Sequence, residues 1–440
     1  MVNKADTATV SLWGNTVGAV SWSAEDNYAI FEYEPSFLNR GLDISPLQMG
    51  LAQARGGDGL FFSPGLNRDT FLGLPGLLAD SLPDKFGNSV IDAWLARQGR
   101  SAADFSPVER LCYTGKRGMG ALEFTPATIS RYDKSVDVDI SELVALTQQI
   151  MSERMHLNTS LHSESAHAGE AILDILRVGT SAGGARPKAV IAINAQQQVI
   201  SGQLPPPPGF DSWIIKFDGV SDLELGEPKA YGRIEYGYHL MAKAAGITMS
   251  ECRLLEEQGR AHFMTRRFDR LGAEKLHMHS LCGIAHFDFN QPGAYSYEQV
   301  FAVMRQLRLS KQEAVQQFRR MVFNVIARNQ DDHTKNIAFL MDKSGKWKLS
   351  PAFDMNYSHN PSGRWTSQHQ MSLNGKRDNF VLDDLLAVAQ SISLSRPMTV
   401  IAQVQNAIKR WPEFARQAGL AERRIEEIRV AQHLKVAGSA

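Results

Sequence analysis

The stretch between positions 331 and 354 decides the fold and the chemistry expected of this chain. It opens with Asp331-Asp332-His333-Thr334-Lys335-Asn336, continues through a short apolar segment predicted as a hairpin, and closes with Ser350-Pro351-Ala352-Phe353-Asp354. Phosphoryl transfer needs a carboxylate that orients and deprotonates an acceptor hydroxyl, a cation near the moving phosphoryl group, and an amide and a second carboxylate that hold Mg²⁺. One loop and the end of the next strand supply all four, so the pattern predicts a kinase active site.

Composition limits the classes of protein to which the chain can belong. With 440 residues, 43% of them hydrophobic and 9% aromatic, it can form two or three domains with well-filled cores. Its 47 lysines and arginines balance 47 aspartates and glutamates, so no overall field draws it to a nucleic acid or an anionic membrane. Contact with DNA would therefore need a local patch or a partner.

The cysteines and the N-terminal sequence indicate a cytoplasmic protein. Cys112, Cys252 and Cys282 lie far apart without CxxC spacing, which argues against a zinc site and against a disulfide framework. The N-terminus has neither a signal-peptide core nor an Arg-rich presequence, and no run of about twenty apolar residues could span a bilayer. We therefore expect a cytoplasmic protein without membrane contact.

The first part of the chain is predicted to be rich in strands. Residues 10–12 and 17–20 flank Gly14-Asn15, and residues 28–33 alternate at period two, so we expect a small antiparallel meander. Gly115-Lys116-Arg117-Gly118-Met119-Gly120 is predicted as a tight turn between strands, because as a phosphate cradle it would lack the GK[ST] ending and a clear following helix. Helices are expected over about residues 84–98, 140–154 and 164–177.

The pattern from residue 179 onward predicts a nucleotide site. Gly179-Thr180-Ser181-Ala182-Gly183-Gly184-Ala185-Arg186-Pro187-Lys188 leads into a strand over residues 189–193, a second strand over 213–217 and a helix over 231–245. The remaining elements are expected to be paired strands over 252–255 and 262–267, then helices over 298–307, 311–328 and from about 382.

This order of elements is that of a two-lobed kinase, which holds ATP in the cleft between its lobes. Backbone N–H groups of residues 181–185 can surround phosphate oxygens, because glycine allows close approach without a Cβ clash. Lys216 would reach the α and β phosphates as a compact point charge. Glu235 can orient Lys216, although spacing alone supports that pairing.

Five sequence elements in register resemble the HipA family, the kinase toxins of HipBA toxin–antitoxin systems. They are Ser181-Ala182-Gly183-Gly184-Ala185-Arg186-Pro187-Lys188, Ile214-Ile215-Lys216, Arg267-Phe268-Asp269-Arg270, Asp331-x-His333-x-x-Asn336 and Phe353-Asp354. Leu82-Pro83-Asp84 and Gly118-Met119-Gly120-Ala121 also stand where the family's N-subdomain would place them. The D-x-H-x-x-N motif by itself is shared with phosphoinositide-kinase-like enzymes.

The resemblance implies an α+β, two-lobed protein-kinase-like (phosphoinositide-kinase-like) fold. A small β-rich N-subdomain would occupy residues 1–135, and residues 136–270 would form the remainder of the N-lobe with the phosphate loop and the nucleotide lysine. A mostly helical C-lobe with the catalytic loop would occupy residues 271–440.

The resemblance also implies a role for each matching residue. Asp331 would be the catalytic base, Asn336 and Asp354 would bind Mg²⁺, and His333 and Lys335 would contact phosphates or brace the loop. ATP would further be held by Ala182, Gly183, Gly184, Ala185, Arg186, Lys188 and Lys216, and by the main chain at Arg266, Arg267 and Phe268, which would form the hinge against the adenine. Ser181 would be the autophosphorylation site that switches the protein off.

Known members of the family phosphorylate aminoacyl-tRNA synthetases, and their partner is a HipB-like helix-turn-helix antitoxin that binds operator DNA. The chain departs from the family pattern in three places. Pro187 cannot donate a backbone N–H, and Arg266 stands where a glutamate is frequent. Thr180 adjoins Ser181, so the phosphoacceptor stays open between the two.

Other functions are compatible with the same residues. A small-molecule or lipid kinase would use the same catalytic groups, and a catalytically silent co-repressor would need only its DNA-binding antitoxin. The intact set of Asp331, Asn336, Asp354 and Lys216 disfavours the silent co-repressor.

Several of these residues also have a plainer structural interpretation. Asp331 and Asp332 can be solvated acids in a helix-terminal turn, and His333 can merely pack the loop. Lys216 lies in an apolar strand, where an unpaired buried lysine is costly, so function or an edge position must explain it. Ser181 can simply cap a turn. A surface strand with solvated ends is predicted for Arg266, Arg267 and Arg270.

Overall fold

The computed structural model describes residues 5–83, 87–88, 90–92, 95, 99–101, 105–127, 137–145, 147–148, 186–202, 204–220 and 230–437. The glycine-rich segment 179–185, with Thr180 and Ser181, and the predicted helix over 164–177 lie outside the described residues. The predicted helices over 84–98 and 140–154 are described in part: residues 90–92 and 140–145 are helical.

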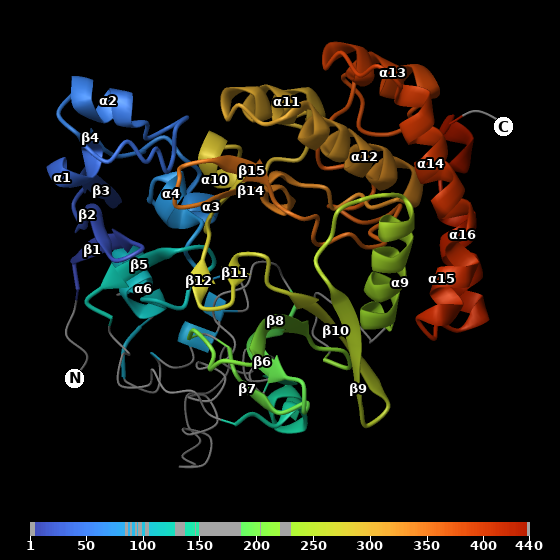
Figure 1. Ribbon diagram of the computed structural model, residues 1–440, viewed down its shortest axis with the longest axis horizontal. Helices are drawn as coiled ribbons and strands as arrows, with labels where there is room; N and C mark the ends of the chain where they lie inside the picture. The colour runs from blue at the N-terminus through green and yellow to red at the C-terminus, as the bar shows by residue number, and fades with distance from the viewer. Residues whose placement is uncertain are drawn as a thin grey trace.

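The N-terminal sheet is a five-stranded antiparallel sheet of order β4-β3-β2-β1-β5 (Figure 1). Its strands are β1 (Thr7–Leu12), β2 (Asn15–Ser23), β3 (Tyr28–Tyr33), β4 (Leu60–Phe61) and β5 (Leu122–Thr125). The period-two pattern buries Ala8, Val10 and Leu12 on one face of β1, which confirms the predicted meander. Among the described residues, this sheet is accompanied by the short helices α1 (Pro35–Leu38), α2 (Leu51–Gly56), α3 (Arg68–Phe71), α4 (Gly76–Ala79) and α6 (Pro107–Thr114).

The glycine-rich turn at residues 115–120 connects helix α6 to strand β5, so the prediction of a turn between two strands is wrong in its first element. Alternation is absent from residues 107–114, where Ser106 instead caps a helix by accepting a hydrogen bond from the Glu109 amide. Gly115 follows the helix with φ of 54°, a conformation that glycine adopts at little cost.

The second sheet has the order β7-β6-β8-β10-β9 and is also antiparallel. Its strands are β6 (Lys188–Asn194), β7 (Val199–Ser201), β8 (Phe210–Lys216), β9 (Cys252–Glu257) and β10 (Arg260–Arg266), and helix α9 (Tyr231–Ala244) packs against β9 and β10. β6, β8, β9, β10 and α9 each confirm a sequence prediction within a few residues, whereas β7 was not predicted. β6 is buried from residue 188 to residue 193, as expected of a strand covered on both faces.

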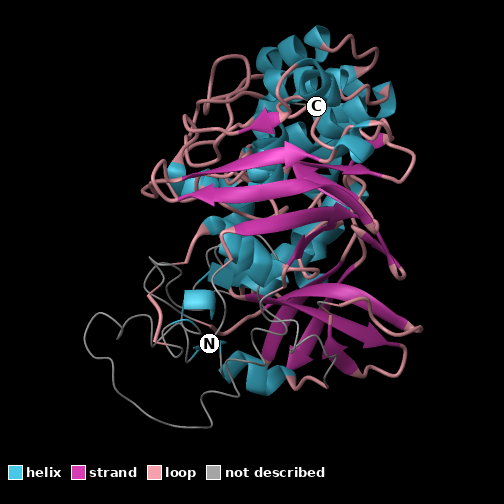
Figure 2. Ribbon diagram, turned by 90° about the vertical axis from the view of Figure 1, so that its left-hand side faces the viewer, coloured by secondary structure: helices cyan, strands magenta, loops and turns pink. Residues whose placement is uncertain are grey.

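The rest of the chain is mostly helical and surrounds a three-stranded sheet of order β13-β14-β15 (Figures 1 and 2). The strands are β11 (Arg270–Leu271), β12 (Glu274–Lys275), β13 (His277–Ser280), β14 (Ala338–Met341) and β15 (Trp347–Leu349), of which β11 and β12 form a separate hairpin. The helices are α10 (Leu281–Ala285), α11 (Tyr297–Gln306), α12 (Lys311–Ala327), η3 (Thr334–Asn336), α13 (Leu382–Ser391), α14 (Pro397–Lys409), α15 (Trp411–Gln417), α16 (Glu422–Ala431) and η4 (Leu434–Ala437). The predicted hairpin and the predicted C-terminal helices are therefore confirmed. None of the described helices is both long and apolar enough to cross a bilayer.

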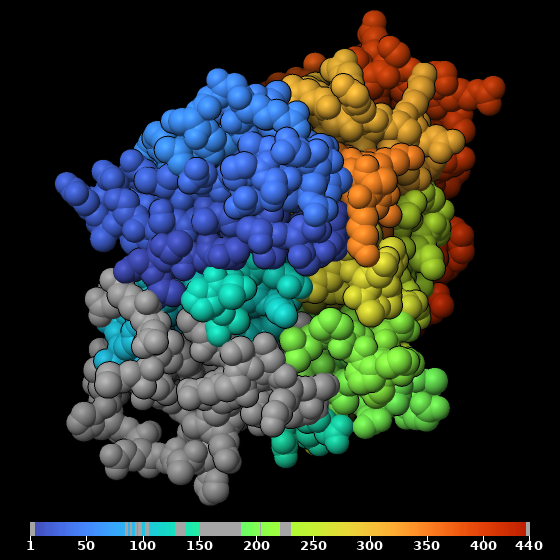
Figure 3. Space-filling model, turned by 60° about the vertical axis from the view of Figure 1, so that its left-hand side comes forward, coloured from blue at the N-terminus to red at the C-terminus, as the bar shows by residue number. Residues whose placement is uncertain are grey.

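The N-terminal sheet shares one continuous hydrophobic core with the C-terminal helices. That core contains Val10 and Phe31 from the sheet together with Phe323 from α12, whereas Ile191 and Ile215 of the second sheet belong to a separate core. Figure 3 shows the blue N-terminal surface lying directly against the orange segment of β14 and β15. The contact includes a hydrogen bond of 3.3 Å from the Trp347 indole to the Asp43 carbonyl. The domain boundaries at 135 and 270 stay predictions.

Candidate active site

Lys216 lies at the end of β8 and bridges two carboxylates. Its Nζ is 2.5 Å from Oε1 of Glu235 on α9 and also contacts Oδ1 of Asp354, which follows β15. The pairing of Lys216 with Glu235, predicted from spacing, is confirmed, and the contact with Asp354 explains how an apolar strand accommodates a lysine that is only 16% exposed. Residues separated in sequence by as many as 138 positions thus meet at one ammonium group.

Burial and neighbouring charges shift the pKa values of Lys216 and Asp354 in opposite directions. Burial by itself lowers the pKa of Lys216, but the Asp354 and Glu235 carboxylates outweigh it and hold that pKa above its ordinary value. For Asp354 the balance is the mirror image, because burial raises the pKa of its carboxyl while Lys216 and then Lys188 hold it below the usual range. Lys216 and Asp354 therefore both favour their charged forms at neutral pH.

Lys188 lies directly opposite Lys216 in the β6–β8 ladder, so both side chains leave the same face of the sheet. Lys188 is 3% exposed. Like charges in such a pair repel each other, and the nearby Asp354 carboxylate offsets that repulsion. We call Lys188, Lys216, Glu235 and Asp354 the lysine cluster. It combines two cations with two anions at one end of the second sheet.

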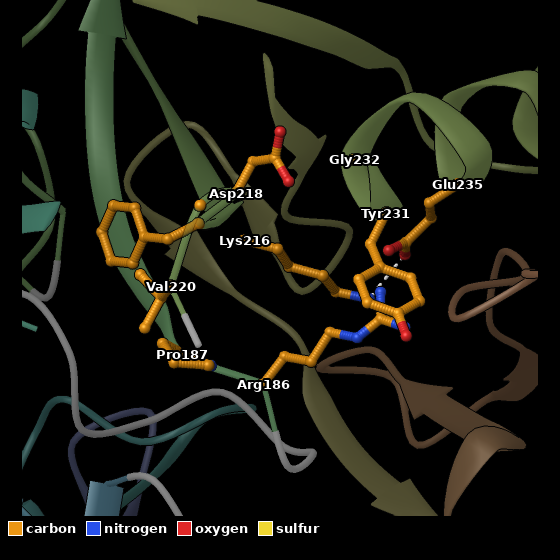
Figure 4. Close-up of a pocket in the computed structure, with 10 residues that line it drawn as sticks. Arg186, Pro187, Lys216, Asp218, Val220, Tyr231, Gly232 and Glu235 are labelled. Atoms are coloured by element: carbon orange, nitrogen blue, oxygen red, sulfur yellow. Dashed lines mark hydrogen bonds and ion pairs between the residues drawn. The ribbon is translucent and has the colours of Figure 1, made fainter. Parts of the chain in front are cut away.

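A pocket of about 440 Å³ opens beside the lysine cluster. Lys216 and Glu235 line it together with Arg186, Pro187, Phe217, Asp218, Gly219, Val220, Tyr231 and Gly232. Figure 4 shows Lys216 and Glu235 pointing toward each other, with the Arg186 guanidinium against the Tyr231 ring at 3.9 Å from its centroid. The Pro187 carbonyl accepts a hydrogen bond of 3.1 Å from the Phe217 amide, so the proline closes the sheet end although it has no N–H of its own.

The 331–336 loop follows α12, which ends at Ala327 with Arg328 in the left-handed conformation. The Asp331 side chain is 48% exposed, and its Oδ1 lies 3.9 Å from His333 Nε2. Asn336 stabilises the loop from within, since its Nδ2 donates to the Asp331 carbonyl at 2.9 Å and its amide N–H donates to the His333 carbonyl at 3.0 Å. Within the described part of the chain, no hydrogen bond to the side-chain oxygen of Asn336 is found, and this oxygen can accept one.

Asp332 has the opposite environment, although it is the next residue. Its side chain is fully buried and accepts hydrogen bonds from the Tyr297 hydroxyl at 2.7 Å, His369 Nδ1 at 2.8 Å and the Gln370 amide at 2.8 Å. Burial raises the pKa of the Asp332 carboxyl, but His369 and the hydrogen bonds outweigh it and hold that pKa low. The interpretation of residues 331 and 332 as two solvated acids is therefore wrong for Asp332.

His333 and Lys335 share a single aromatic support. The Phe289 ring lies 5.4 Å from the His333 ring and 5.3 Å from Lys335 Nζ, centroid distances that permit ring packing and a cation–π contact. His333 Nδ1 is buried without a hydrogen-bond partner within the described residues. A weaker electrostatic interaction with His333 also lowers the pKa of Asp354, after those with Lys216 and Lys188. The 331–336 loop therefore lies close enough to the lysine cluster to interact with it electrostatically.

The segment after β10 connects the second sheet to the rest of the chain. The amides of Arg266 and Arg267 donate to the carbonyls of Glu251 and Ser212, each at 2.9 Å, and the Phe268 ring packs at 5.5 Å from the Phe353 ring. The Arg266 side chain is 47% exposed and pairs with Asp211 on the surface. Two of the three predicted hinge amides are thus already bonded within the protein.

Arg267 and Arg270 are buried, so the prediction of solvated ends is correct only for Arg266. Their guanidinium groups contact Asp269 Oδ2 at 2.7 and 2.6 Å, and the Gly120 amide donates to the same oxygen at 2.8 Å. Burial raises the pKa of Asp269, and the two arginines override it and hold that pKa far below its usual range. The Gly118 carbonyl accepts from Arg270 at 3.0 Å, so the glycine-rich turn binds this ion cluster rather than a phosphate.

The predicted Mg²⁺ ligands fit a magnesium site by chemistry. Mg²⁺ is bound through one or two protein oxygen ligands together with substrate phosphates and water, and Asp354 and Asn336 offer a charged and a neutral oxygen. No cluster of three or more His, Cys, Asp or Glu side chains that could hold a metal occurs among the residues the structure describes. A Mg²⁺ ion held by Asn336 and Asp354 would therefore need further ligands from a nucleotide or from water.

The structure brings Lys216, Glu235 and Asp354 into contact, places Lys188 beside them, and joins Asp331 to Asn336 within one loop. Ala182, Gly183, Gly184, Ala185 and Ser181 lie outside the described residues, so their predicted roles are not examined by it. Sequence reasoning missed Asp332, Asp269 and Phe289 as parts of the site. The alternating Arg267-Phe268-Asp269-Arg270 segment carried a signal for the ion cluster, since an acid between two arginines can pair with both.

The fold and this site define a two-lobed α+β protein whose β-rich N-terminal part is joined to a helical C-terminal part. Residues 180–433 match the HipA-like C-terminal domain and residues 8–125 match the HipA N-terminal domain. The chain belongs to the HipA family.

Among solved structures, the chain resembles HipA of Shewanella oneidensis MR-1, which was determined in a complex with HipB and its operator DNA. The TM-score is 0.65 at 15% sequence identity, over 96% of this chain and 95% of that chain, which confirms the predicted fold class. The chain is also similar to the Helicobacter pylori proinflammatory kinase CtkA, with a TM-score of 0.36 at 14% sequence identity, over 58% of this chain and 91% of that chain. A search of curated proteins found no match.

Proposed function

We propose that the chain is an ATP-dependent serine/threonine protein kinase that acts as the toxin of a toxin–antitoxin system. The observation that carries this proposal is the meeting of Lys216, Glu235 and Asp354 at one ammonium group. A buried lysine held between two carboxylates has little structural purpose, because an apolar residue of similar volume would cost less to bury. A nucleotide that carries several phosphates and a magnesium ion gives each of the three groups a purpose.

The proposed reaction divides the work between the two parts of the site. Mg²⁺-ATP supplies the transferable phosphoryl group and the divalent charge. Lys216 and Lys188 neutralise phosphate oxygens, and Asn336 and Asp354 would hold the metal. Asp331 orients the acceptor hydroxyl and takes its proton as that oxygen bonds to the γ-phosphorus, while the bond from this phosphorus to the β–γ bridging oxygen breaks and ADP leaves. His333 and Lys335 contact phosphates or brace the loop. Positioning and charge neutralisation supply most of the rate.

The exposure of Asp331 supports its assignment as the base. A residue that receives a proton from a protein substrate must be reachable from outside, and its side chain is 48% exposed while its neighbour Asp332 is fully buried. Arg186, Arg266, Arg267 and Phe268 complete the proposed nucleotide site. For the last three, the adenine contact would be made by main-chain groups, and Phe268 is the one of the three for which no amide hydrogen bond to a described residue is found.

The proposed biological role follows the family. HipA of Shewanella oneidensis was crystallised with HipB and operator DNA, which supports a HipB-like helix-turn-helix antitoxin as partner. This chain has no net charge, so operator DNA would be reached through that antitoxin. The proposed substrate is a translation component such as an aminoacyl-tRNA synthetase. Phosphorylation of Ser181, or of the adjacent Thr180, would bring nearly two negative charges into the predicted phosphate loop and exclude ATP.

Incubation of the purified chain with γ-labelled ATP and a cell extract tests the proposal. We expect label on serine or threonine of extract proteins and on Ser181 or Thr180 of the chain itself, and none with Asp331→Asn. Asp383→Asn, a change of an exposed acid on α13, is the matched control and should label as the wild type does. Label that appears only in small molecules or lipids would favour a metabolite or lipid kinase. No label in any fraction would favour a silent co-repressor.

A further inference from the structure

Helix α10 (Leu281–Ala285) lies between α4 of the N-terminal part and the 331–336 loop. At its N-terminal end, Asp80 at the end of α4 accepts three hydrogen bonds from the residues that begin α10. The donors are His279 Nδ1 at 2.5 Å, the Ser280 amide at 2.8 Å and the Ser280 hydroxyl at 2.6 Å. Ser280 in turn caps α10 by accepting from the Gly283 amide at 3.0 Å.

The other end of α10 is also bound to α4. The Gly76 amide donates to Nε2 of His286, the residue that ends α10, at 3.0 Å. A Cβ at Gly76 would stand 2.1 Å from the Gly283 carbonyl oxygen, and a Cβ at Gly283 would stand 2.2 Å from Asp80 Oδ2. Because neither position tolerates a side chain, the two helices are held at a distance that only glycine permits.

Two further hydrogen bonds connect α10 and the segment just after it to the 331–336 loop and to the residue that follows this loop. The Leu281 amide donates to the carbonyl of Ile337, the residue after Asn336, at 2.8 Å. The Thr334 hydroxyl donates to the Phe287 carbonyl at 2.7 Å. A displacement of α10 would therefore move the ends of η3, and with them Asn336.

A second connection reinforces the first. Asn67 Nδ2 donates to Asp288 at 2.6 Å, Thr70 also bonds Asp288, and Asn290 Nδ2 donates to Thr70 Oγ1 at 2.9 Å. Between these two anchored residues lies Phe289, whose ring packs against His333 and Lys335. The N-terminal part thus holds both the helix and the aromatic side chain on which the loop lies.

We propose that the N-terminal part of the chain positions the 331–336 loop for phosphoryl transfer, with Asp80 as a positioning residue that acts through α10. The inference rests on the proposed function, since it assigns a role to that part in the same reaction. Asp80 does not touch substrate. It fixes Ser280 and His279, and through the α10 contacts it sets where Asn336 and Asp331 stand relative to the lysine cluster.

The test compares three variants for kcat, KM for ATP and amide hydrogen exchange of peptides covering residues 331–338. Asp80→Ala removes all three bonds, and we expect kcat to fall roughly 10- to 100-fold with KM for ATP nearly unchanged. Exchange in the loop should be roughly tenfold faster. Asp80→Asn should retain most of the activity, because its amide oxygen can accept from His279 and the Ser280 amide while its NH₂ donates to the Ser280 hydroxyl. Asp92→Ala, which breaks an ion pair with Arg110 inside the N-terminal part, should leave kcat, KM for ATP and loop exchange unchanged.

Ser280→Ala removes one of the three bonds to Asp80 together with the cap of α10. It should show the same selective loss to a smaller degree if Asp80→Ala does not fold. If the wild type is an active kinase and kcat and loop exchange are unaltered in Asp80→Ala or in Ser280→Ala, the inference is wrong. Faster loop exchange in these variants of a chain that transfers no phosphate would refute the proposed kinase but support the coupling of Asp80 to the loop. Unaltered exchange in that case would overturn both.

Discussion

The lysine cluster and the 331–336 loop hold their charged groups in opposite ways. Lys216 contacts two carboxylates directly. The side chains of Lys216, Glu235 and Asp354 are 16%, 4% and 27% exposed. In the loop, the half-exposed Asp331 carboxylate lies 3.9 Å from His333 Nε2, while Asp332 and Asn336 make hydrogen bonds that fix the loop. Under the proposed function, the groups that would bind the nucleotide are held in place by ion pairs, whereas the group that would take a proton is accessible on a loop fixed by its neighbours.

The largest effect is expected where that accessible group is removed. Asp331→Asn should lower kcat by roughly 10²- to 10⁴-fold, because general base catalysis contributes about that much. ATP affinity, measured by calorimetry, should stay close to that of the wild type, since the lysine cluster is untouched. An Asp331→Asn protein with normal kcat would contradict the assignment of Asp331 as the general base.

The next effect is expected in the lysine cluster. Lys216→Met should weaken ATP binding and should also lower the free energy of unfolding by about 3 kcal/mol, because it leaves Glu235 and Asp354 without their shared cation. Calorimetry and urea unfolding measure the two losses. Wild-type ATP affinity in this variant would show that the cluster is a structural ion pair only.

Arg266 and Arg267 in the predicted hinge allow an exposed charge to be compared with a buried one. Arg267→Ala should cost about 3 kcal/mol of unfolding free energy, because it leaves the buried Asp269 with one arginine instead of two. Arg266→Ala breaks a surface ion pair and should cost less than about 1 kcal/mol, with KM for ATP unchanged. Equal losses of stability in the two variants would contradict the assignment of Arg267 to a buried cluster.

The smallest effect concerns the pH dependence of stability from Asp332. Its pKa is lower in the folded protein than in the unfolded chain, so its ionised form stabilises the fold above the unfolded-state value of about 4. That contribution is lost as pH falls through the lower folded-state pKa. Asp332→Asn should therefore be less stable than the wild type at pH 7 by about 1–2 kcal/mol, and the difference should narrow below about pH 4. A difference that is constant from pH 7 to pH 3 would argue against a charged Asp332.

Much of the fold could be predicted because its signals are local. The meander, the β14–β15 hairpin and the helices after residue 297 follow from period and caps within short windows, as in the Ser310 capping box that begins α12. The Lys216–Glu235 contact was also within reach, because a strand followed by one helix fixes their relation over 19 positions.

The supports of the site could not be predicted in the same way, because they join residues that are remote in sequence. Asp80 meets His279 across 199 positions, and Gly118 meets Arg270 across 152. Neither residue is unusual in its own window. The burial of Asp332 could not be predicted either, although Asp331 is its neighbour. Two adjacent acids look alike in sequence, and only the tertiary packing decides which one is buried.

The most direct test is a crystal structure of the chain with Mg²⁺ and a non-hydrolysable ATP analogue. The account predicts phosphates against Lys216, a metal ion bound by Asn336 and Asp354, and Asp331 facing the terminal phosphate. A nucleotide bound elsewhere, or a metal ion that contacts neither Asn336 nor Asp354, would contradict it.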